Sequence, residues 1–417
     1  MMLETVDRIE PARLEEVPEA ISDLVAEIAT ISAKLENALH PQTAAGLAQM
    51  VRIMNTYYSN LIEGHRTRPR DIEQALRLGS SNIKDIPETS QIETAVAGSI
   101  DHQPSKRSLL IEAVAHVKVQ AEIDRLHATG QLPEPASQDF ICWLHDEFYR
   151  GADVEMLRIR GVNSEITMEP GYWRSRPEHD NVVGLHRPPS SERVADFMMH
   201  FAKRYKFENL GKAARIIAIP AAHHRFNYIH PFPDGNGRVS RLMSHAMAHA
   251  AGIGAHGLWS ISRGLARGLE SRTDYKRYMS HADTPRQGDL DGRGNLSHRA
   301  LIDFTLWFLR LCVDQLGFMS SLFELNTLAL RLANYVERSE NLKPEAAPLL
   351  QEALIRGTFE RGDISRITGL PERTARRLLN DVIAEGLLVS DTPKGSLSLR
   401  FPLKTQDILF PRLFEVS

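Results

Sequence analysis

The segment IHPFPDGNGRVSR, which covers residues 229–241, gathers residue types that can hold phosphate groups. Gly235, Asn236 and Gly237 can adopt backbone conformations in which consecutive amide N–H groups converge on an anion. A helix is expected directly after them, and its first amides and its dipole also favour negative charge. Arg238 and Arg241 lie on one face of that helix. The spacing therefore predicts a cradle for a polyphosphate.

Two residues that precede the glycines could supply the chemistry. Asp234 is in a position to bind Mg2+, which neutralises phosphate charge. A histidine ordinarily titrates near neutral pH, so His230 can act as a base toward an incoming hydroxyl. Phe232, between them, is expected to pack the loop against the core. A glycine-rich helix cap would need neither a histidine nor a pair of arginines, so the segment favours a reactive site.

This segment resembles the signature of the Fic family, H-x-F-x-D/E-G-N-G-R-x-x-R, and fills each of its fixed positions. The resemblance implies a mainly α Fic fold with a short β-hairpin, the flap, beside the active site. It implies that His230 deprotonates a hydroxyl of a target protein, that Asp234 binds Mg2+, and that the loop amides with both arginines hold the phosphates of ATP. Kinase-like members carry a lysine in place of the second glycine. Gly237 therefore indicates transfer of AMP, with attack at the α-phosphorus and release of pyrophosphate.

A second resemblance lies upstream, in TYYSNLIEGHRT, residues 56–67. Ser59, Glu63 and Gly64 match the pattern S/T-x-x-x-E-G/N of the inhibitory helix found in one class of Fic proteins. Ser59 and Glu63 share a helix face, and Gly64 is suited to end the helix. In that class Glu63 would pair with Arg241, take the place of the γ-phosphate and hold ATP in an unproductive pose.

The same resemblance suggests two further site assignments. Residues 169–189 (EPGYWRSRPEHDNVVGLHRPP) look like the flap, whose free hairpin edge could add a target peptide as an extra strand. Tyr275 and Tyr278 fall where the family places residues that contact adenine, although packing would explain them almost as well. We assign Tyr275 to the nucleotide site.

Three histidines, His223, His224 and His230, invite a zinc interpretation. No H-E-x-x-H pattern or cysteine pair accompanies them, and the anion loop makes better use of His230. We therefore expect His223 to be a core histidine.

The composition is that of an ordinary globular protein, with 417 residues, 42% of them hydrophobic and 25% charged. The net charge of -3 gives no general attraction to nucleic acid, so contact with DNA would need a local basic patch. Cys142 and Cys312, the two cysteines, lie in apolar helical contexts and are expected to be free buried thiols. The sequence carries no signal pattern and no apolar run of membrane-spanning length, so we expect a cytoplasmic protein without membrane contact.

Apolar residues recur at helical spacing along most of the chain, which predicts a mainly α protein. We expect an N-terminal helical region at 1–110 that holds the inhibitory helix at about 41–64, a Fic catalytic core at 111–337 and a separate domain at 346–417. Residues 85–107 and 282–300 are polar and are expected to be loops.

The C-terminal part has the pattern of a winged helix-turn-helix: two helices, a turn, a helix from Pro371 to about Glu385, and a hairpin. Arg373, Arg376 and Arg377 on the last of these helices could contact DNA. Acidic residues share the same helix, so contact with a protein is equally consistent with the pattern.

Three functions stay open at this point. The first is AMP transfer that Glu63 holds low. The second is a DNA-binding regulator whose Fic part only senses a nucleotide. The third is removal of AMP, because in some relatives the inhibitory glutamate positions a hydrolytic water. The sequence also leaves homo-oligomer formation open.

Overall fold

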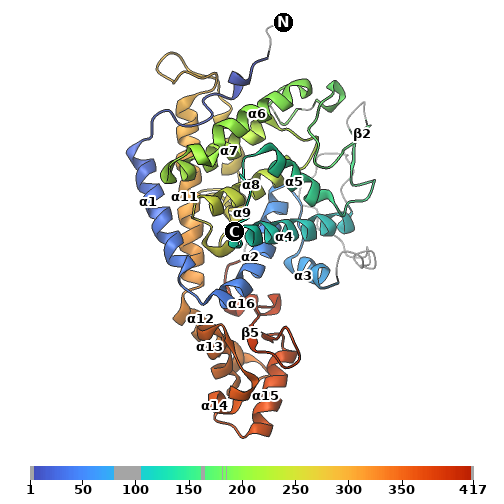
Figure 1. Cartoon of the computed structure of the whole chain (residues 1–417), viewed down its shortest axis with the longest axis vertical. Helices are drawn as coiled ribbons and strands as arrows, with labels where there is room; N and C mark the ends of the chain where they lie inside the picture. Colours follow the sequence, from blue (N-terminus) through green and yellow to red (C-terminus); the bar gives the residue numbers. More distant parts are fainter. Residues whose placement is uncertain (1–3, 79–104, 161–164, 181, 185, 415–417) are drawn as a thin grey trace.

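The computed structural model describes residues 4–78, 105–160, 165–180, 182–184 and 186–414. The fold is mainly α-helical with two small sheets, which confirms the predicted fold class (Figure 1). In chain order, the α-helices of these residues are α1 (Glu19–Glu36), α2 (Pro41–Ile62), α3 (Pro69–Leu78), α4 (Lys106–Ala128), α5 (Gln138–Tyr149), α6 (Val194–Tyr205), α7 (Lys212–Ile229), α8 (Asn236–Ala250), α9 (Ile261–Arg267), α10 (Asp274–Ala282), α11 (His298–Leu322), α12 (Leu325–Arg338), α13 (Ala346–Arg356), α14 (Ile364–Thr368), α15 (Glu372–Ala384) and α16 (Gln406–Leu409). The strands are β1 (Arg158–Arg160), β2 (Glu165–Thr167), β3 (Thr358–Phe359), β4 (Leu388–Val389) and β5 (Leu397–Leu399). None of the helices described is both long and apolar enough to cross a membrane.

The helical body is built around α7 and α8, which pack against each other and are joined by the short segment 230–235. Both helices are buried on almost every face, as central helices are. α1 lies along α11 on one side of the body (Figure 1). α2 packs against both α4 and α9. This packing brings the end of α2 to the start of α8, where the predicted site lies.

The β-hairpin of the body lies before the segment that the sequence analysis assigned to the flap. β1 and β2 are antiparallel, with Ile159 opposite Ile166. The described part of 169–189 contains one isolated antiparallel bridge, between Val183 and His186, among turns and a short 3₁₀ helix, and the assignment of this segment as the flap stays a prediction. The four prolines of the segment lack the N–H that a strand ladder needs. The two strands, at 158–160 and 165–167, instead alternate polar and apolar residues.

The C-terminal part contains the predicted helices and hairpin. α15 begins directly after Pro371 and ends just before Glu385, close to the predicted bounds. β3, β4 and β5 form one antiparallel sheet in the order β3-β5-β4. β3 was not predicted, because a strand of two residues carries too little pattern to detect. The assignment of this part as a winged helix stays a prediction.

The predicted division into three domains also stays a prediction, and two features of the structure bear on it. The boundary at 110 falls inside α4, and the buried apolar cluster of the body continues from Ile9 as far as Leu413. Residues 403–414 return to the body: Oη of Tyr58 in α2 donates a hydrogen bond to the carbonyl of Leu413 at 3.0 Å, and Arg263 donates to the carbonyl of Arg412 at 3.1 Å. The C-terminal segment is thus tied directly to α2.

The two predicted loops have different outcomes. Residues 283–297 are a loop with one isolated bridge, and Ser297 caps the first turn of α11. Most of the loop predicted at 85–107 lies outside the described residues. Cys142 and Cys312 are free thiols, the first half-buried and the second buried.

Candidate active site

The segment between α7 and α8 is fixed by the side chain of Asn236. Its Oδ1 accepts a hydrogen bond from the N–H of Phe232 at 2.9 Å, and its Nδ2 donates to the carbonyl of Phe232 at 2.8 Å. Phe232 is fully buried and stacks on the ring of His145, 3.8 Å between centres. The side chain of Asn236 is therefore used inside the loop, and only its backbone N–H is left for the predicted phosphate contact.

Gly235 makes the turn into α8. Its backbone is in the left-handed region, with φ of 78°, and a methyl group there would lie 2.9 Å from the ring and the hydroxyl of Tyr149. Both the backbone and the neighbour therefore require glycine. The first hydrogen bond into the helix runs from the N–H of Val239 to the carbonyl of Gly235 at 3.0 Å. The preceding N–H groups of the first turn have no helical partner, as a phosphate site requires.

His230 ends α7 in the left-handed conformation, with φ of 51°. The buried side chain of Arg174 holds this backbone, because its Nε donates to the carbonyl of His230 at 2.6 Å and its Nη2 to that of Ile229 at 2.9 Å. Burial, helped by the charge of Arg174, lowers the pKa of His230 to about 4. The imidazole is therefore neutral at pH 7 and can accept a proton.

Arg238 lies in the first turn of α8 in a buried, charged environment. Its Nη2 is 2.9 Å from Oε2 of Glu112 on α4, and its guanidinium lies 5.2 Å from the ring centre of Phe148. Its Nε and Nη1 are buried and have no hydrogen-bond partner among the described residues. A buried cation with two unused donors is suited to receive phosphate oxygens.

Asp234 offers a carboxylate beside this turn. Oδ2 accepts one long hydrogen bond, from Oη of Tyr149 at 3.3 Å. The carbonyl of Asp234 lies 3.2 Å from Nε2 of His145, whose Nδ1 accepts a hydrogen bond from Gly171. Most lone pairs of the carboxylate are thus available, and oxygen atoms of this kind suit Mg2+. The residue fits the metal-binding role that the resemblance implies.

Arg241 binds the two residues of α2 that the sequence analysis singled out. Its Nε donates to Oγ of Ser59 at 2.9 Å, and its Nη2 donates to Oε1 of Glu63 at 2.6 Å. The carbonyl of Ser59 accepts a further bond from Nη2 at 3.3 Å. The arginine side chain is 1% exposed and that of Glu63 is 32% exposed. The glutamate therefore closes the outer side of a buried guanidinium.

Glu63 also lies directly over the loop. A methyl group on Gly237 would be 2.5 Å from Oε1 of Glu63 and 3.1 Å from Nη1 of Arg241. Burial alone would raise the pKa of Glu63, but the charges of Arg241 and Arg238 outweigh it and hold that pKa below its usual range. An ionised carboxylate thus stands where the loop and the arginines would receive an anion.

Gly64 ends α2 as predicted. Its φ is 87°, its N–H donates to the carbonyl of Leu61 at 3.1 Å, and the N–H of His65 donates to that of Asn60 at 2.9 Å. This pair of bonds is the Schellman motif, which requires a left-handed residue after the helix cap. The motif fixes Glu63 as the cap residue and so fixes the direction in which its side chain leaves the helix.

Tyr275 is held in the core. Its hydroxyl lies 2.8 Å from Nε2 of His223, its ring is near and roughly parallel to that of Trp307, and the residue is 9% exposed. Its role as an adenine contact stays a prediction. His223 and His224 are fully buried and hydrogen-bonded, His223 also to Ser244, so His223 is the core histidine that was expected.

Four residues of the site were missed by sequence reasoning: Glu112, His145, Tyr149 and Arg174. A signal existed for Glu112, because it interrupts an apolar stretch of a predicted helix. The other three carry no local pattern, since the fold brings them to the loop from elsewhere: His145 and Tyr149 come from α5, and Arg174 comes from the segment after β2.

Part of the chain, including the loop, is similar to one family of known proteins. Residues 135–248 match the Fic/DOC family, a range that includes the loop but not the end of α2. Proteins named protein adenylyltransferase Fic from Drosophila erecta and Drosophila melanogaster are 36% identical over 100 residues, which are 24% of this chain and 20% of each relative. The match thus spans about a fifth of the length of these relatives.

Solved structures with a similar fold include a Fic family protein from Desulfovibrio desulfuricans G20, with a TM-score of 0.49 and 17% identity over 94% of this chain and 98% of that one. A Fic domain containing signaling protein from Bacteroides thetaiotaomicron VPI-5482 has a TM-score of 0.47 and 18% identity over 73% of this chain and 96% of that one.

Proposed function

This chain contains a domain of the Fic/DOC family, and from it we propose that the protein transfers AMP from ATP to a hydroxyl side chain of a target protein. The observation that carries the proposal is the arrangement around the first turn of α8. Two buried arginines, Arg238 with unused donors and Arg241, flank a glycine loop that begins at a neutral His230. Such a loop binds a polyphosphate and leaves a base beside it.

In the proposed reaction the phosphates of ATP bind the backbone N–H groups of the loop and the two arginines. His230 accepts the proton of the target hydroxyl, whose oxygen forms a bond to the α-phosphorus. The bond from the α-phosphorus to the bridging oxygen breaks, and pyrophosphate leaves. Asp234 would hold Mg2+, which spreads the negative charge of the phosphates when bound.

We further propose that Glu63 inhibits this reaction. Its carboxylate is hydrogen-bonded to the guanidinium of Arg241, which the outer phosphate of ATP would otherwise bind. The same carboxylate covers the backbone of Gly237. A charge-assisted bond of this kind competes directly with a phosphate oxygen, because both use the same donors.

The target is proposed to dock beside the loop, at the hairpin of β1 and β2 and the segment that follows it. Thr167 of β2, Trp173 and Pro233 of the loop line one shared pocket. The short hairpin offers free strand edges, which can pair with an extended peptide.

The distinguishing experiment is incubation of the full chain and a cell lysate with ATP-Mg labelled at either the α- or the γ-phosphate. AMP transfer puts the α-label on protein and leaves the γ-label in pyrophosphate. Protein labelled from the γ-position would indicate a kinase, and protein labelled from neither position, even with Glu63 replaced by glycine, would contradict the proposal.

A DNA-binding regulator is the second candidate, because Arg373, Arg376 and Arg377 are exposed on α15. Arg376 is paired with Glu372 on the same helix, which reduces the free positive charge. A gel shift with genomic fragments, abolished by replacing Arg373 and Arg377 with alanine, would support this function.

Removal of AMP is the third candidate, since Glu63 stands over the phosphate loop and could orient a water. Its test is release of AMP from pre-labelled protein.

A further inference from the structure

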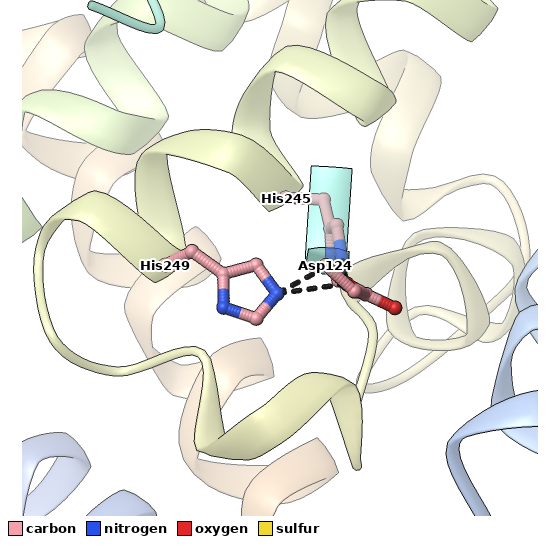
Figure 2. A group of neighbouring side chains, drawn as sticks. All are labelled: Asp124, His245 and His249. Atoms are coloured by element: carbon pink, nitrogen blue, oxygen red, sulfur yellow. Dashed lines mark hydrogen bonds and ion pairs between the residues drawn. The ribbon is translucent and has the colours of Figure 1, made fainter. Parts of the chain in front are cut away.

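Asp124, His245 and His249 form a second cluster of chemically active side chains, apart from the loop (Figure 2). Asp124 comes from α4, and the two histidines are one turn apart on α8. The three residues are 9%, 7% and 2% exposed. Along α8, His249 lies about 18 Å beyond Gly237 at 1.5 Å per residue, so the cluster is separate from the position of Asp234.

Figure 2 shows the two imidazoles and the carboxylate converging on one point. Oδ1 of Asp124 lies 2.7 Å from Nε2 of His245 and 2.9 Å from Nε2 of His249. The two Nε2 atoms lie 3.2 Å from each other. Three nitrogen and oxygen atoms are therefore mutually within hydrogen-bond distance, with no other side chain between them.

Protons alone can hold this triangle in one way, with both Nε2 atoms protonated so that Oδ1 accepts two hydrogen bonds from nitrogens 3.2 Å apart. If one Nε2 instead carries a lone pair toward the others, that lone pair faces a carboxylate oxygen at less than 3 Å. A cation that accepts a lone pair from all three atoms removes that repulsion.

We propose that Asp124, His245 and His249 bind a divalent transition-metal ion, with Zn2+ the best suited. Tetrahedral Zn2+ holds nitrogen and oxygen ligands at about 2.0–2.2 Å, which puts them about 3.3 Å apart, so the sides of the triangle need to lengthen by about 0.1 to 0.6 Å. Two imidazoles and one carboxylate, completed by a water, are a ligand set that this ion uses. Mg2+ and Ca2+ prefer oxygen ligands alone.

The neighbouring residues determine which oxygen of Asp124 is available to the ion. Oδ2 of Asp124 accepts a hydrogen bond from Nε of Arg52 on α2 at 2.7 Å, so Oδ1 is the oxygen left for the ion. Asp124 and His245 keep a small exposed fraction, so the residues of the cluster are nearly but not completely enclosed. The site would join α4 to α8 beside α2, and its occupancy would add to the stability of the folded chain.

The test uses the full chain, stripped with a chelator and dialysed, with excess Mg2+ present throughout. Zn2+ is titrated by calorimetry and Co2+ by its visible absorption. We expect one ion per chain, the intense absorption of tetrahedral cobalt, and a rise of the melting temperature on adding Zn2+. Asp124→Asn and His249→Gln, which preserve shape and some hydrogen bonding, should each weaken binding at least about tenfold and lose the cobalt spectrum.

Two matched variants separate this site from others. His281→Gln removes an exposed histidine that pairs with Asp303, and Asp234→Asn removes the carboxylate proposed for Mg2+; both should bind Zn2+ as the unmodified chain does. Absence of Zn2+ binding by the unmodified chain would overturn the proposal and would show that the cluster is a hydrogen-bond network only. Equal binding by folded Asp124→Asn and His249→Gln would also overturn it, because the ion would then lie elsewhere.

Discussion

The carboxylate of Glu63 occupies the space where a side chain on Gly237 would begin: a methyl group there would lie 2.5 Å from Oε1. The second glycine of the loop therefore has two consequences. It leaves the backbone N–H groups of the first turn open to an anion, and it lets the end of α2 approach close enough for Glu63 to reach Arg241. The loop and the end of α2 fit each other at this one position.

Ser59→Ala should activate AMP transfer partially. The hydroxyl of Ser59 holds Nε of Arg241 at 2.9 Å, and its loss leaves the guanidinium with fewer partners on α2. A hydrogen bond to a charged group contributes about 1.5 kcal/mol, so we expect about tenfold faster self-labelling. The measurement compares initial rates with α-labelled ATP for the unmodified chain, Ser59→Ala and Ser59→Thr. Thr keeps the hydroxyl and should stay near the unmodified rate; equal rates for all three would show that Ser59 does not restrain Arg241.

His230→Ala should abolish AMP transfer and leave ATP binding nearly unchanged, because the base contacts the nucleophile rather than the nucleotide. Labelling and nucleotide binding are measured in parallel in a Glu63→Gly background. Undiminished labelling in the alanine variant would exclude His230 as the base.

The pH dependence of kcat/KM tests the environment of the same residue. The pKa of His230 is lowered to about 4, so the imidazole stays neutral, and able to act as a base, well below the ordinary pKa of about 6.5. In the Glu63→Gly background we expect the acid limb of kcat/KM to have its midpoint nearer pH 4 than pH 6.5. A midpoint near 6.5 would contradict the buried environment described for His230.

Tyr58→Phe should raise basal AMP transfer modestly. The hydroxyl of Tyr58 ties α2 to the carbonyl of Leu413, and its loss weakens the attachment of the helix that carries Glu63. One neutral hydrogen bond contributes about 1 kcal/mol, which limits the gain to about fivefold.

Removal of residues 346–417 should also raise basal AMP transfer and should leave AMP transfer intact in a Glu63→Gly background. A folded, ATP-binding truncation without activity in that background would show that catalysis depends on the C-terminal part.

Acid should destabilise the fold through its buried histidines. Burial lowers the pKa of His116 and of His223 to about 3 and that of His145 to about 4. The unfolded chain takes up these protons near pH 6.5, so the stability of the neutral forms is complete above pH 6.5 and is lost as the pH falls toward 4. Each group should add about 1.4 kcal/mol per pH unit to the slope of the free energy of unfolding against pH. Urea denaturation between pH 7.5 and 4.5 measures it, with His116→Gln expected to flatten the slope by one such contribution.

The sequence was sufficient to single out the loop and the residues of α2 that contact Arg241, because both consist of short patterns on continuous segments. Ser59, Glu63 and Gly64 follow helical spacing and a helix end, and the structure brings the first two to Arg241. The sequence pattern of the loop could not show that the side chain of Asn236 is hydrogen-bonded to the backbone of Phe232, because those bonds depend on how the loop folds.

What the sequence did not reveal depends on contacts between distant segments. Arg174, which donates a hydrogen bond to the carbonyl of His230, lies outside the sequence segment that forms the loop. Asp124 is more than a hundred residues from His245. The β1–β2 hairpin at 158–167 was not predicted, because two strands of three residues carry too little pattern to detect.

The most direct measurement is the rate of self-labelling from α-labelled ATP-Mg for the unmodified chain, Glu63→Gly, Glu63→Gln and Glu63→Gly combined with Arg241→Ala. We expect Glu63→Gly to be strongly activated, because Arg241 and the space over Gly237 both become available to the phosphates. Glu63→Gln removes the charge but keeps the bulk, so it should be activated less. The double variant should fall back, because the guanidinium that binds the outer phosphate is gone. Equal rates for the unmodified chain and Glu63→Gly would contradict inhibition by Glu63, and a fully active double variant would show that Arg241 is not the group that Glu63 restrains.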